Sequence, residues 1–115
     1  MGKNFINYDE ISNMLTTFQN LKESCSSNNT NAMNAFQSFV NSGVRLSNSG
    51  YVSSVESTAS NVSKNAETLT QDYDRLINYL SKLSEAARAA DNQAITKIQA
   101  REIWNTQETA TGGSN

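Results

Sequence analysis

The fold is decided by residues 52–94, which read VSSVESTASNVSKNAETLTQDYDRLINYLSKLSEAARAADNQA. Apolar residues recur through this stretch in strict alternation of three and four positions, and no proline interrupts them. These thirteen residues are Val52, Val55, Ala59, Val62, Ala66, Leu69, Tyr73, Leu76, Leu80, Leu83, Ala87, Ala90 and Ala94. A mean spacing of about 3.5 residues keeps one face of a helix turned towards a partner over many turns. Such a stripe packs against other helices, so it directs the search for function to protein partners.

The composition of the 115 residues excludes several classes of function. A net charge of −2 makes nucleic acid and anionic membranes poor partners, and no apolar run approaches the length of a membrane span. The chain has no histidine and one cysteine, so it lacks the commonest general base and metal ligand. Asp72 and Asp74 lie two positions apart and therefore point to different faces of a helix. We expect neither an enzyme nor a cofactor-binding protein.

A second amphipathic segment precedes the stripe. Asn7 and Glu10 have the spacing of a capping box, and apolar residues recur over positions 11–40. The polar run at 26–31 (SSNNTN) could divide this segment into two helices or be a solvated part of one. It contains neither proline nor glycine, so we favour one continuous helix. Cys25 falls on the apolar face, which is typical of a buried small hydrophobe rather than of an interchain disulfide.

Turn-forming residues separate the two segments. Gly43 is a good helix C-cap, and Asn48, Ser49 and Gly50 are good turn residues. We therefore predict an all-α domain over residues 1–105, an antiparallel hairpin of two long helices. Helix one is expected at about 7–43, the turn at about 44–50 and the longer helix two at about 51–104. Residues 106–115 are expected to be disordered.

The end of the second predicted helix has no partner within the hairpin. If the chain turns between Gly43 and Gly50, Asn7 lies opposite Ala87, which leaves roughly 17 residues, on the order of 25 Å of helix, unpaired. An unpaired apolar stripe is unfavourable in water, so we predict that it binds another chain. The predicted interface consists of Tyr73, Leu76, Ile77, Leu80, Leu83, Ala94, Ile95, Ile98 and Ile103.

The apolar stripe broadens between Tyr73 and Leu83, where Ile77 and Tyr79 join it. A helix that contacts several others carries such a broad band. Pairing of two hairpins into a four-helix bundle would bury it, and we favour this over a monomeric bundle in which the first segment folds back.

The turn and the closing helix carry a family resemblance. Asn48-Ser49-Gly50 stands at the place of a Trp-any-Gly motif, with the glycine retained and the tryptophan replaced. In the segment 87–94, Asp91 is followed three positions later by Ala94, as in the closing helix of the same family. With its size, leaderless N-terminus and two long helices, the chain resembles the WXG superfamily, small helical hairpins of type VII secretion in Gram-positive bacteria. The resemblance covers about residues 6–104.

The resemblance implies a non-enzymatic secretion substrate or targeting factor. Chains without the tryptophan look like the divergent partners of LXG toxins, which bind the helical N-terminal domain of the toxin and help deliver it to the secretion ATPase complex. The chain would then be cytoplasmic before export and would leave the cell without a signal peptide. A self-associating, secreted WXG-type homodimer and a structural coiled coil are the alternatives, so the partner is a toxin domain or a second WXG-like chain.

The resemblance also implies a secretion signal, an aromatic residue followed four positions later by an acid. At the aligned position Asp91 follows Ala87, which is not aromatic. Trp104 and Glu108 have the required spacing, and residues four apart share one helical face. The alternative is that Trp104 closes a dimer interface and Glu108 only ends the helix.

Overall fold

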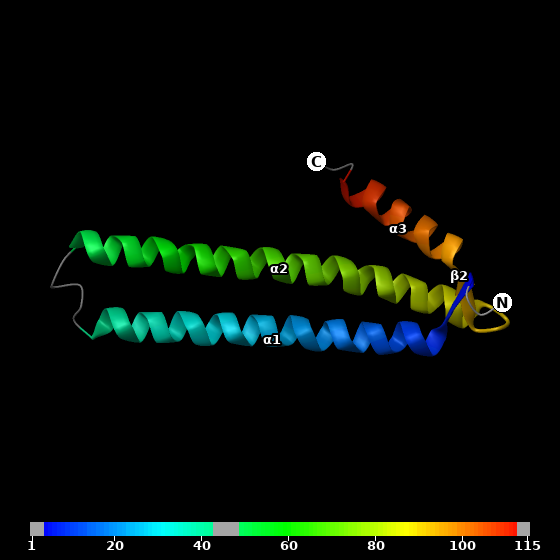
Figure 1. Ribbon diagram of the computed structural model, residues 1–115, viewed down its shortest axis with the longest axis horizontal. Helices are drawn as coiled ribbons and strands as arrows, with labels where there is room; N and C mark the ends of the chain where they lie inside the picture. The colour runs from blue at the N-terminus through cyan, green and yellow to red at the C-terminus, as the bar shows by residue number, and fades with distance from the viewer. Residues whose placement is uncertain (1–3, 43–48, 113–115) are drawn as a thin grey trace. The chain divides into compact units, whose positions relative to one another are not determined.

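The computed structural model describes the backbone of residues 4–42 and 49–112. Two long helices dominate it, α1 (Tyr8–Asn41, 34 residues) and α2 (Ser49–Ala89, 41 residues). The described chain also contains β1 (Phe5–Asn7), β2 (Ala94–Thr96) and α3 (Lys97–Gly112), as Figure 1 shows. The predicted all-α hairpin with a longer second helix is confirmed.

Helix α1 begins at its capping residues and is continuous. The Asn7 Oδ1 atom accepts a hydrogen bond of 2.8 Å from the Glu10 backbone N–H, and the Asn7 amide donates to Glu10 Oε1 at 3.0 Å. This cap satisfies a backbone donor at the start of the helix that has no partner within it. The polar run at 26–31 lies inside α1, so the prediction of one continuous helix is confirmed.

Helix α2 ends much earlier than the sequence pattern indicates. We predicted a helix to about residue 104, but α2 ends at Ala89 and the chain turns over residues 90–93. Gln93 has a φ of 53°, in the left-handed region that reverses the chain direction. The Asn92 side chain then accepts a hydrogen bond of 3.2 Å from the Ala94 N–H. The prediction is wrong because the alanines of this part of the stripe offer little apolar area with which to continue a packed helix.

The turn leads into a short antiparallel clasp between β1, which precedes α1, and β2, which precedes α3. Strand β1 pairs with β2 in the register Phe5↔Thr96, Ile6↔Ile95 and Asn7↔Ala94. Helix α3 then begins with a capping box, in which the Gln99 N–H donates to Thr96 Oγ1 (3.0 Å) and the Thr96 N–H donates to Gln99 Oε1 (2.8 Å). The clasp therefore fixes both the start of α1 and the start of α3.

Helix α3 also corrects the prediction for the C-terminal residues. We expected disorder from residue 106, but the helix continues to Gly112. The predicted turn residue Asn48 lies outside the described residues, whereas Gly50 belongs to the first turn of α2 and is exposed.

The chain divides into two compact units. The terminal unit comprises Met1–Asn20 and Asp74–Asn115, and the hairpin unit comprises Leu21–Tyr73. Helices α1 and α2 each contribute a segment to both units. No described helix is both long enough and apolar enough to cross a membrane.

The hydrophobic core lies in the terminal unit. Its buried members come from α1, α2, β2 and α3, and they are Ile11, Leu80, Leu83, Ala87, Ile95 and Ala100. In the hairpin unit, Val40 and Val52 are the only buried apolar residues that the structure describes. The terminal unit therefore holds most of the buried apolar surface of the described chain.

Candidate partner-binding surface

The predicted unpaired end of helix two does not exist, because the chain folds back on itself. Ile95 is 1% exposed within the core, and Ile103 of α3 packs against the same core. Leu80 and Leu83, which we also placed in the interface, are buried there as well. The apolar stripe of α2 therefore packs against β2 and α3 of the same chain. The sequence pattern did not predict this intramolecular contact.

The remaining predicted interface residues differ in how much surface they offer. Tyr73, Leu76, Ile77 and Ala94 are half-buried. Ile98 is 61% exposed on α3. Of these residues, Ile98 is therefore the one most open to another chain.

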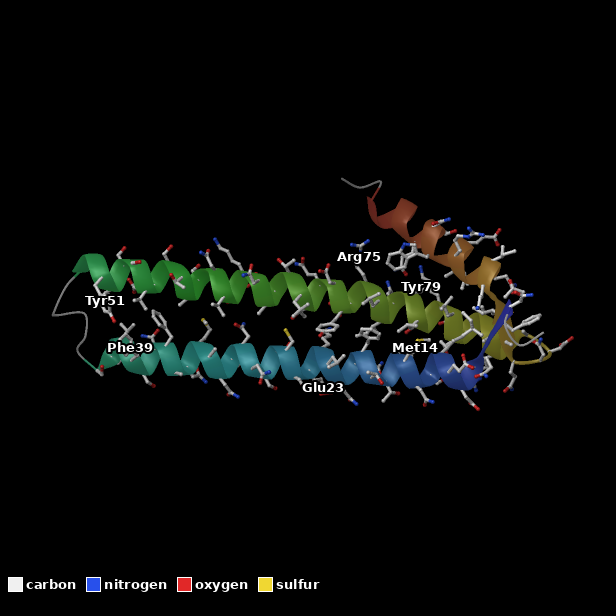
Figure 2. The ribbon with its side chains drawn as sticks, in the orientation of Figure 1. Met14, Glu23, Phe39, Tyr51, Arg75 and Tyr79 are labelled. Atoms are coloured by element: carbon white, nitrogen blue, oxygen red, sulfur yellow. The ribbon has the colours of Figure 1, made fainter. Side chains whose placement is uncertain are left out.

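Trp104 is a contact residue of the terminal unit. Its ring meets the ring of Tyr79 edge to face, with centroids 5.0 Å apart and an interplanar angle of 80°. The Arg75 guanidinium carbon lies 5.8 Å from the centre of the Trp104 ring. Figure 2 shows Arg75 and Tyr79 on α2, on the side that α3 covers. The predicted signal residue therefore helps to hold α3 on α2.

Two polar side chains complete the contact between α2 and α3. The Tyr79 hydroxyl donates to the Ala100 carbonyl oxygen at 3.0 Å, and burial raises the pKa of this hydroxyl. The Gln107 amide donates to the Arg75 carbonyl oxygen at 3.0 Å. Gln107 is only 4% exposed, and its Oε1 atom is buried without a hydrogen-bond partner among the described residues. Sequence reasoning missed Gln107 because it assigned this segment to a disordered tail.

The other residues of the predicted secretion signal are distributed over different parts of the terminal unit. Asp91 is exposed in the turn after α2. Glu108 lies in α3, but its side chain is outside the described part of the structure. The pairing of Trp104 with Glu108 as a recognition motif stays a prediction.

The hairpin unit carries most of the large exposed apolar side chains of the described chain. They are Leu21, Phe39, Tyr51, Val62 and Leu69, each between 42% and 51% exposed. Figure 2 labels Phe39 on α1 and Tyr51 on α2, near the end of the hairpin that joins the two helices. The exposed apolar surface of the described chain therefore lies mainly in the hairpin unit rather than at the C-terminal end of the predicted second helix.

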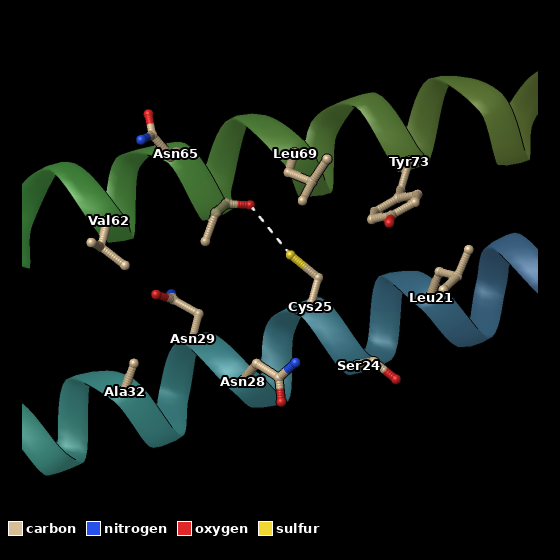
Figure 3. A pocket seen from close by; sticks show the side chains of 11 residues that line it. Leu21, Ser24, Cys25, Asn28, Asn29, Ala32, Val62, Asn65, Leu69 and Tyr73 are labelled. Carbon is tan, nitrogen blue, oxygen red and sulfur yellow. Dashed lines mark hydrogen bonds between the residues drawn. The ribbon is translucent and has the colours of Figure 1, made fainter.

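A groove of about 540 Å³ lies between α1 and α2 in the hairpin unit (Figure 3). Its lining contains no lysine, arginine, aspartate or glutamate. The lining residues are Leu21, Ser24, Cys25, Asn28, Asn29, Ala32, Val62, Asn65, Ala66, Leu69 and Tyr73. An uncharged groove with exposed apolar walls is suited to an apolar helix or to another uncharged ligand.

Two polar groups of α1 lie in this groove. Cys25 is half-buried rather than buried, with Sγ 3.9 Å from both the Ala66 carbonyl oxygen and the Thr70 hydroxyl. The Asn29 Oδ1 atom is buried and has no hydrogen-bond partner in the described structure. In Figure 3 the Asn29 side chain points from α1 towards α2.

No model of a protein family, no curated protein and no solved structure matches the chain. Among the described residues, no three cysteine, aspartate or glutamate side chains form a group that could hold a metal ion.

Proposed function

We propose that the chain is a non-enzymatic binding protein that engages the helical N-terminal domain of an LXG-type toxin and helps deliver it to a type VII secretion machine. The observation that carries the proposal is the exposed apolar surface of the hairpin unit, with its uncharged groove between α1 and α2. The toxin domain as partner comes from the resemblance at Asn48-Ser49-Gly50 and at residues 87–94. The protein would act in the cytoplasm and leave the cell with its partner.

The groove also indicates how the partner would bind. Two neighbouring helices with an apolar groove between them accept the apolar ridge of a third helix. A helical hairpin of the toxin domain would supply two such helices, and the complex would be a four-helix bundle built across the hairpin unit. Val62 and Leu69 of α2 would lie at the centre of this contact, because they line the groove and are nearly half exposed.

Introduction of a charge into the groove tests the proposal. The chain is expressed together with the N-terminal domain of an LXG-type toxin encoded beside its gene, and the complex is measured by light scattering and calorimetry. We expect Leu69→Asp to weaken binding by at least about 100-fold, because an unpaired carboxylate would be buried against apolar side chains. Thr68→Asp places the same charge on an adjacent exposed position and is expected to change binding by less than about twofold.

Circular dichroism of each variant shows whether the helices are intact. Retained binding by a helical Leu69→Asp variant would contradict the proposed interface. The absence of any complex with the wild-type chain would contradict the proposed partner.

A further inference from the structure

The hydrogen bonds between β1 and β2 determine which backbone groups of the two strands face away from the sheet. The Tyr8 N–H donates to the Gln93 carbonyl oxygen at 2.8 Å, directly after the last pair of the ladder, in which Asn7 lies opposite Ala94. In an antiparallel ladder, pairs that exchange hydrogen bonds alternate with pairs that do not. Ile6 therefore bonds to β2, the backbone groups of the residues on either side of it point outward, and the same holds for the residues opposite them.

The outer edge of β2 is protected by side chains that lie next to it in the chain. The Ala94 N–H donates to Asn92 Oδ1 at 3.2 Å, and the Thr96 N–H donates to Gln99 Oε1 at 2.8 Å. Both outward N–H groups of this strand are thus occupied. Proteins use such devices to prevent an edge strand from pairing with another chain, so β2 offers no donor to a further strand.

The outer edge of β1 lacks this protection. Phe5 and Asn7 are exposed, and no group among the described residues bonds to the Phe5 N–H, the Phe5 carbonyl oxygen or the Asn7 N–H. The Asn7 carbonyl oxygen belongs to α1, because the carbonyl of a capping residue accepts the first bond within its helix. The edge of β1 therefore presents a donor and an acceptor at Phe5 and a second donor at Asn7, which is the spacing that an antiparallel strand requires.

A hollow beside this edge has room for one side chain. Its volume is about 420 Å³, and its lining residues are Asn4, Phe5, Thr96, Lys97 and Ile98. The apolar side chains of Phe5 and Ile98 are 42% and 61% exposed. Directly paired residues of neighbouring strands project their side chains to the same face of a sheet. A residue that bonds to Phe5 from outside would therefore place its side chain beside the Phe5 ring, where an apolar side chain fits.

The charges around the edge differ between its two ends. Among the described residues, Lys97 is the one charged residue that lines the hollow. Asp9 and Glu10 lie at the other end, in the first turn of α1 directly after Asn7. A carboxylate is therefore favoured at the Lys97 end of the edge and disfavoured at the Asn7 end. In an antiparallel partner, whose chain runs from Asn7 towards Phe5, the acidic residue follows the apolar one.

We propose that the terminal unit binds an extended peptide segment of another protein, which adds to the outer edge of β1 as a third, antiparallel strand. An apolar residue of this segment exchanges two hydrogen bonds with Phe5 and places its side chain in the hollow beside Ile98. The residue two positions before it accepts a hydrogen bond from the Asn7 N–H, and an acidic residue after it lies near Lys97. This inference goes beyond the proposed function, because it gives the chain a second binding surface, in the other unit and for an extended partner rather than a helical one.

A synthetic peptide of sequence TKVTISD tests the proposal, since its isoleucine can lie opposite Phe5 with the aspartate towards Lys97. The peptide carries fluorescein at its N-terminus and an amide at its C-terminus, and its binding to the full-length chain is measured by fluorescence anisotropy. We expect a dissociation constant below about 500 µM. Methylation of the isoleucine nitrogen removes the donor to the Phe5 carbonyl oxygen and should weaken binding at least about fivefold. Methylation of the serine nitrogen, which points away from β1, is the control and should change binding by less than about twofold.

Two substitutions in the chain test the hollow. Phe5→Ala should weaken binding of the peptide at least about fivefold, whereas Phe39→Ala, at an equally exposed position of the hairpin unit, should stay within about twofold of the wild type. Lys97→Glu should weaken binding at least about threefold, and less at high salt. Lys64→Glu makes the same change of charge at an exposed position of the hairpin unit and should have an effect below about twofold. Far-ultraviolet circular dichroism shows that each variant is folded.

Amide exchange measured by nuclear magnetic resonance locates the added strand. Saturation with the unlabelled peptide should slow exchange of the Phe5 and Asn7 N–H groups with solvent, because both become hydrogen-bonded. The Ile6 N–H already bonds to β2 and should change much less. Slower exchange at Ile6 without any change at Phe5 and Asn7 would overturn the proposed pairing.

Two further results would overturn the proposal. They are the absence of binding at about 1 mM peptide and an equal loss of affinity on methylation of either nitrogen. The groove of the hairpin unit takes no part in this contact, so Leu69→Asp should bind the peptide as the wild type does. Binding of the peptide by a chain that binds no toxin domain would support this proposal and contradict the proposed function, and the reverse result would do the opposite.

Discussion

At the scale of single residues, Trp104 shows how a short helix is held on a longer one. Its ring contacts Tyr79 edge to face and lies beside the Arg75 guanidinium. An aromatic pair of this kind contributes about 0.5–1.5 kcal/mol beyond the burial of its area, and an exposed cation over a ring contributes about 0.5–1 kcal/mol. The sequence analysis gave Trp104 either a place in a secretion signal or a place in a dimer interface, and it did not indicate the contact with Tyr79 of the same chain.

Truncation of this ring should loosen α3. We expect Trp104→Ala to lower the free energy of unfolding by about 1–3 kcal/mol, because both ring contacts and half-buried apolar area are lost. Trp104→Phe keeps an aromatic ring and should lose less than half as much. Urea unfolding followed by circular dichroism measures the difference, and equal stabilities for wild type and Trp104→Ala would refute the contact.

Substitutions at Gln107 measure how much its buried amide contributes to the free energy of unfolding when only the nitrogen is hydrogen-bonded. Gln107→Ala removes its bond to the Arg75 carbonyl oxygen and leaves a void, so we expect a loss of about 1–2 kcal/mol. Gln107→Met has a similar shape and removes the unsatisfied Oε1 atom, so it should stay within about 0.5 kcal/mol of the wild type. Urea unfolding of the two variants decides the matter, and a larger loss for methionine than for alanine would contradict this account.

Tyr79 makes the terminal unit sensitive to alkaline pH. Burial raises the pKa of its hydroxyl above the usual 10.0, so the folded state favours the neutral form that donates to Ala100. This contribution is complete below pH 10 and is lost as the pH rises through the raised pKa. Unfolding curves from neutral pH upwards should show a steeper decline above pH 10 for the wild type than for Tyr79→Phe; parallel declines would contradict the prediction.

At the scale of elements, the sequence predicted α1 closely and α2 only in part. Asn7 and Glu10 marked the start of α1, and the absence of proline and glycine from residues 26–31 correctly indicated a continuous helix. The end of α2 escaped detection because the turn at residues 90–93 also has neither residue, and Gln93 adopts a positive φ without a glycine. The start of α3 could have been predicted from Thr96 and Gln99, because these residues have the spacing of a capping box.

A glycine substitution at Gln93 tests whether the chain turns after α2 or continues as a helix. Gln93→Gly removes the steric cost of a left-handed residue, so we expect the free energy of unfolding to rise by about 0.5–1 kcal/mol. Gln71→Gly places the same residue at an exposed position inside α2 and should lower it by about 1 kcal/mol. Thermal and urea unfolding measure both variants, and destabilisation by Gln93→Gly would indicate that the helix continues past Ala89.

At the scale of the whole molecule, the two units differ in how much apolar surface they bury. The sequence pattern predicted unpaired apolar surface at the end of helix two, because a helix assumed to continue to residue 104 outlasts its neighbour. That prediction is wrong, since α2 ends at Ala89. In the structure the C-terminal residues pack on the core of the terminal unit. Most of the large exposed apolar side chains lie in the hairpin unit, and Leu69 and Val62 are among them.

This difference predicts a gradient of protection in amide hydrogen exchange. Exchange followed by mass spectrometry should be slowest around Ile11, Leu83 and Ala87, where the core is buried, and faster over residues 21–40 and 53–73. Adding a toxin domain should slow exchange in the hairpin unit and leave the terminal unit unchanged. Uniform protection of the free chain would contradict this prediction.

The pairing of β1 with β2 also sets the order in which the protein can fold. Joining Phe5 to Thr96 closes a loop of about 90 residues, whereas the contact of Cys25 with Ala66 closes one less than half as long. During synthesis the strand at Phe5–Asn7 must wait until Ala94–Thr96 has left the ribosome, while α1 and the first part of α2 are already complete. The nascent chain therefore presents its exposed hairpin surface before it acquires its core, which gives a binding partner the chance to engage it while synthesis continues.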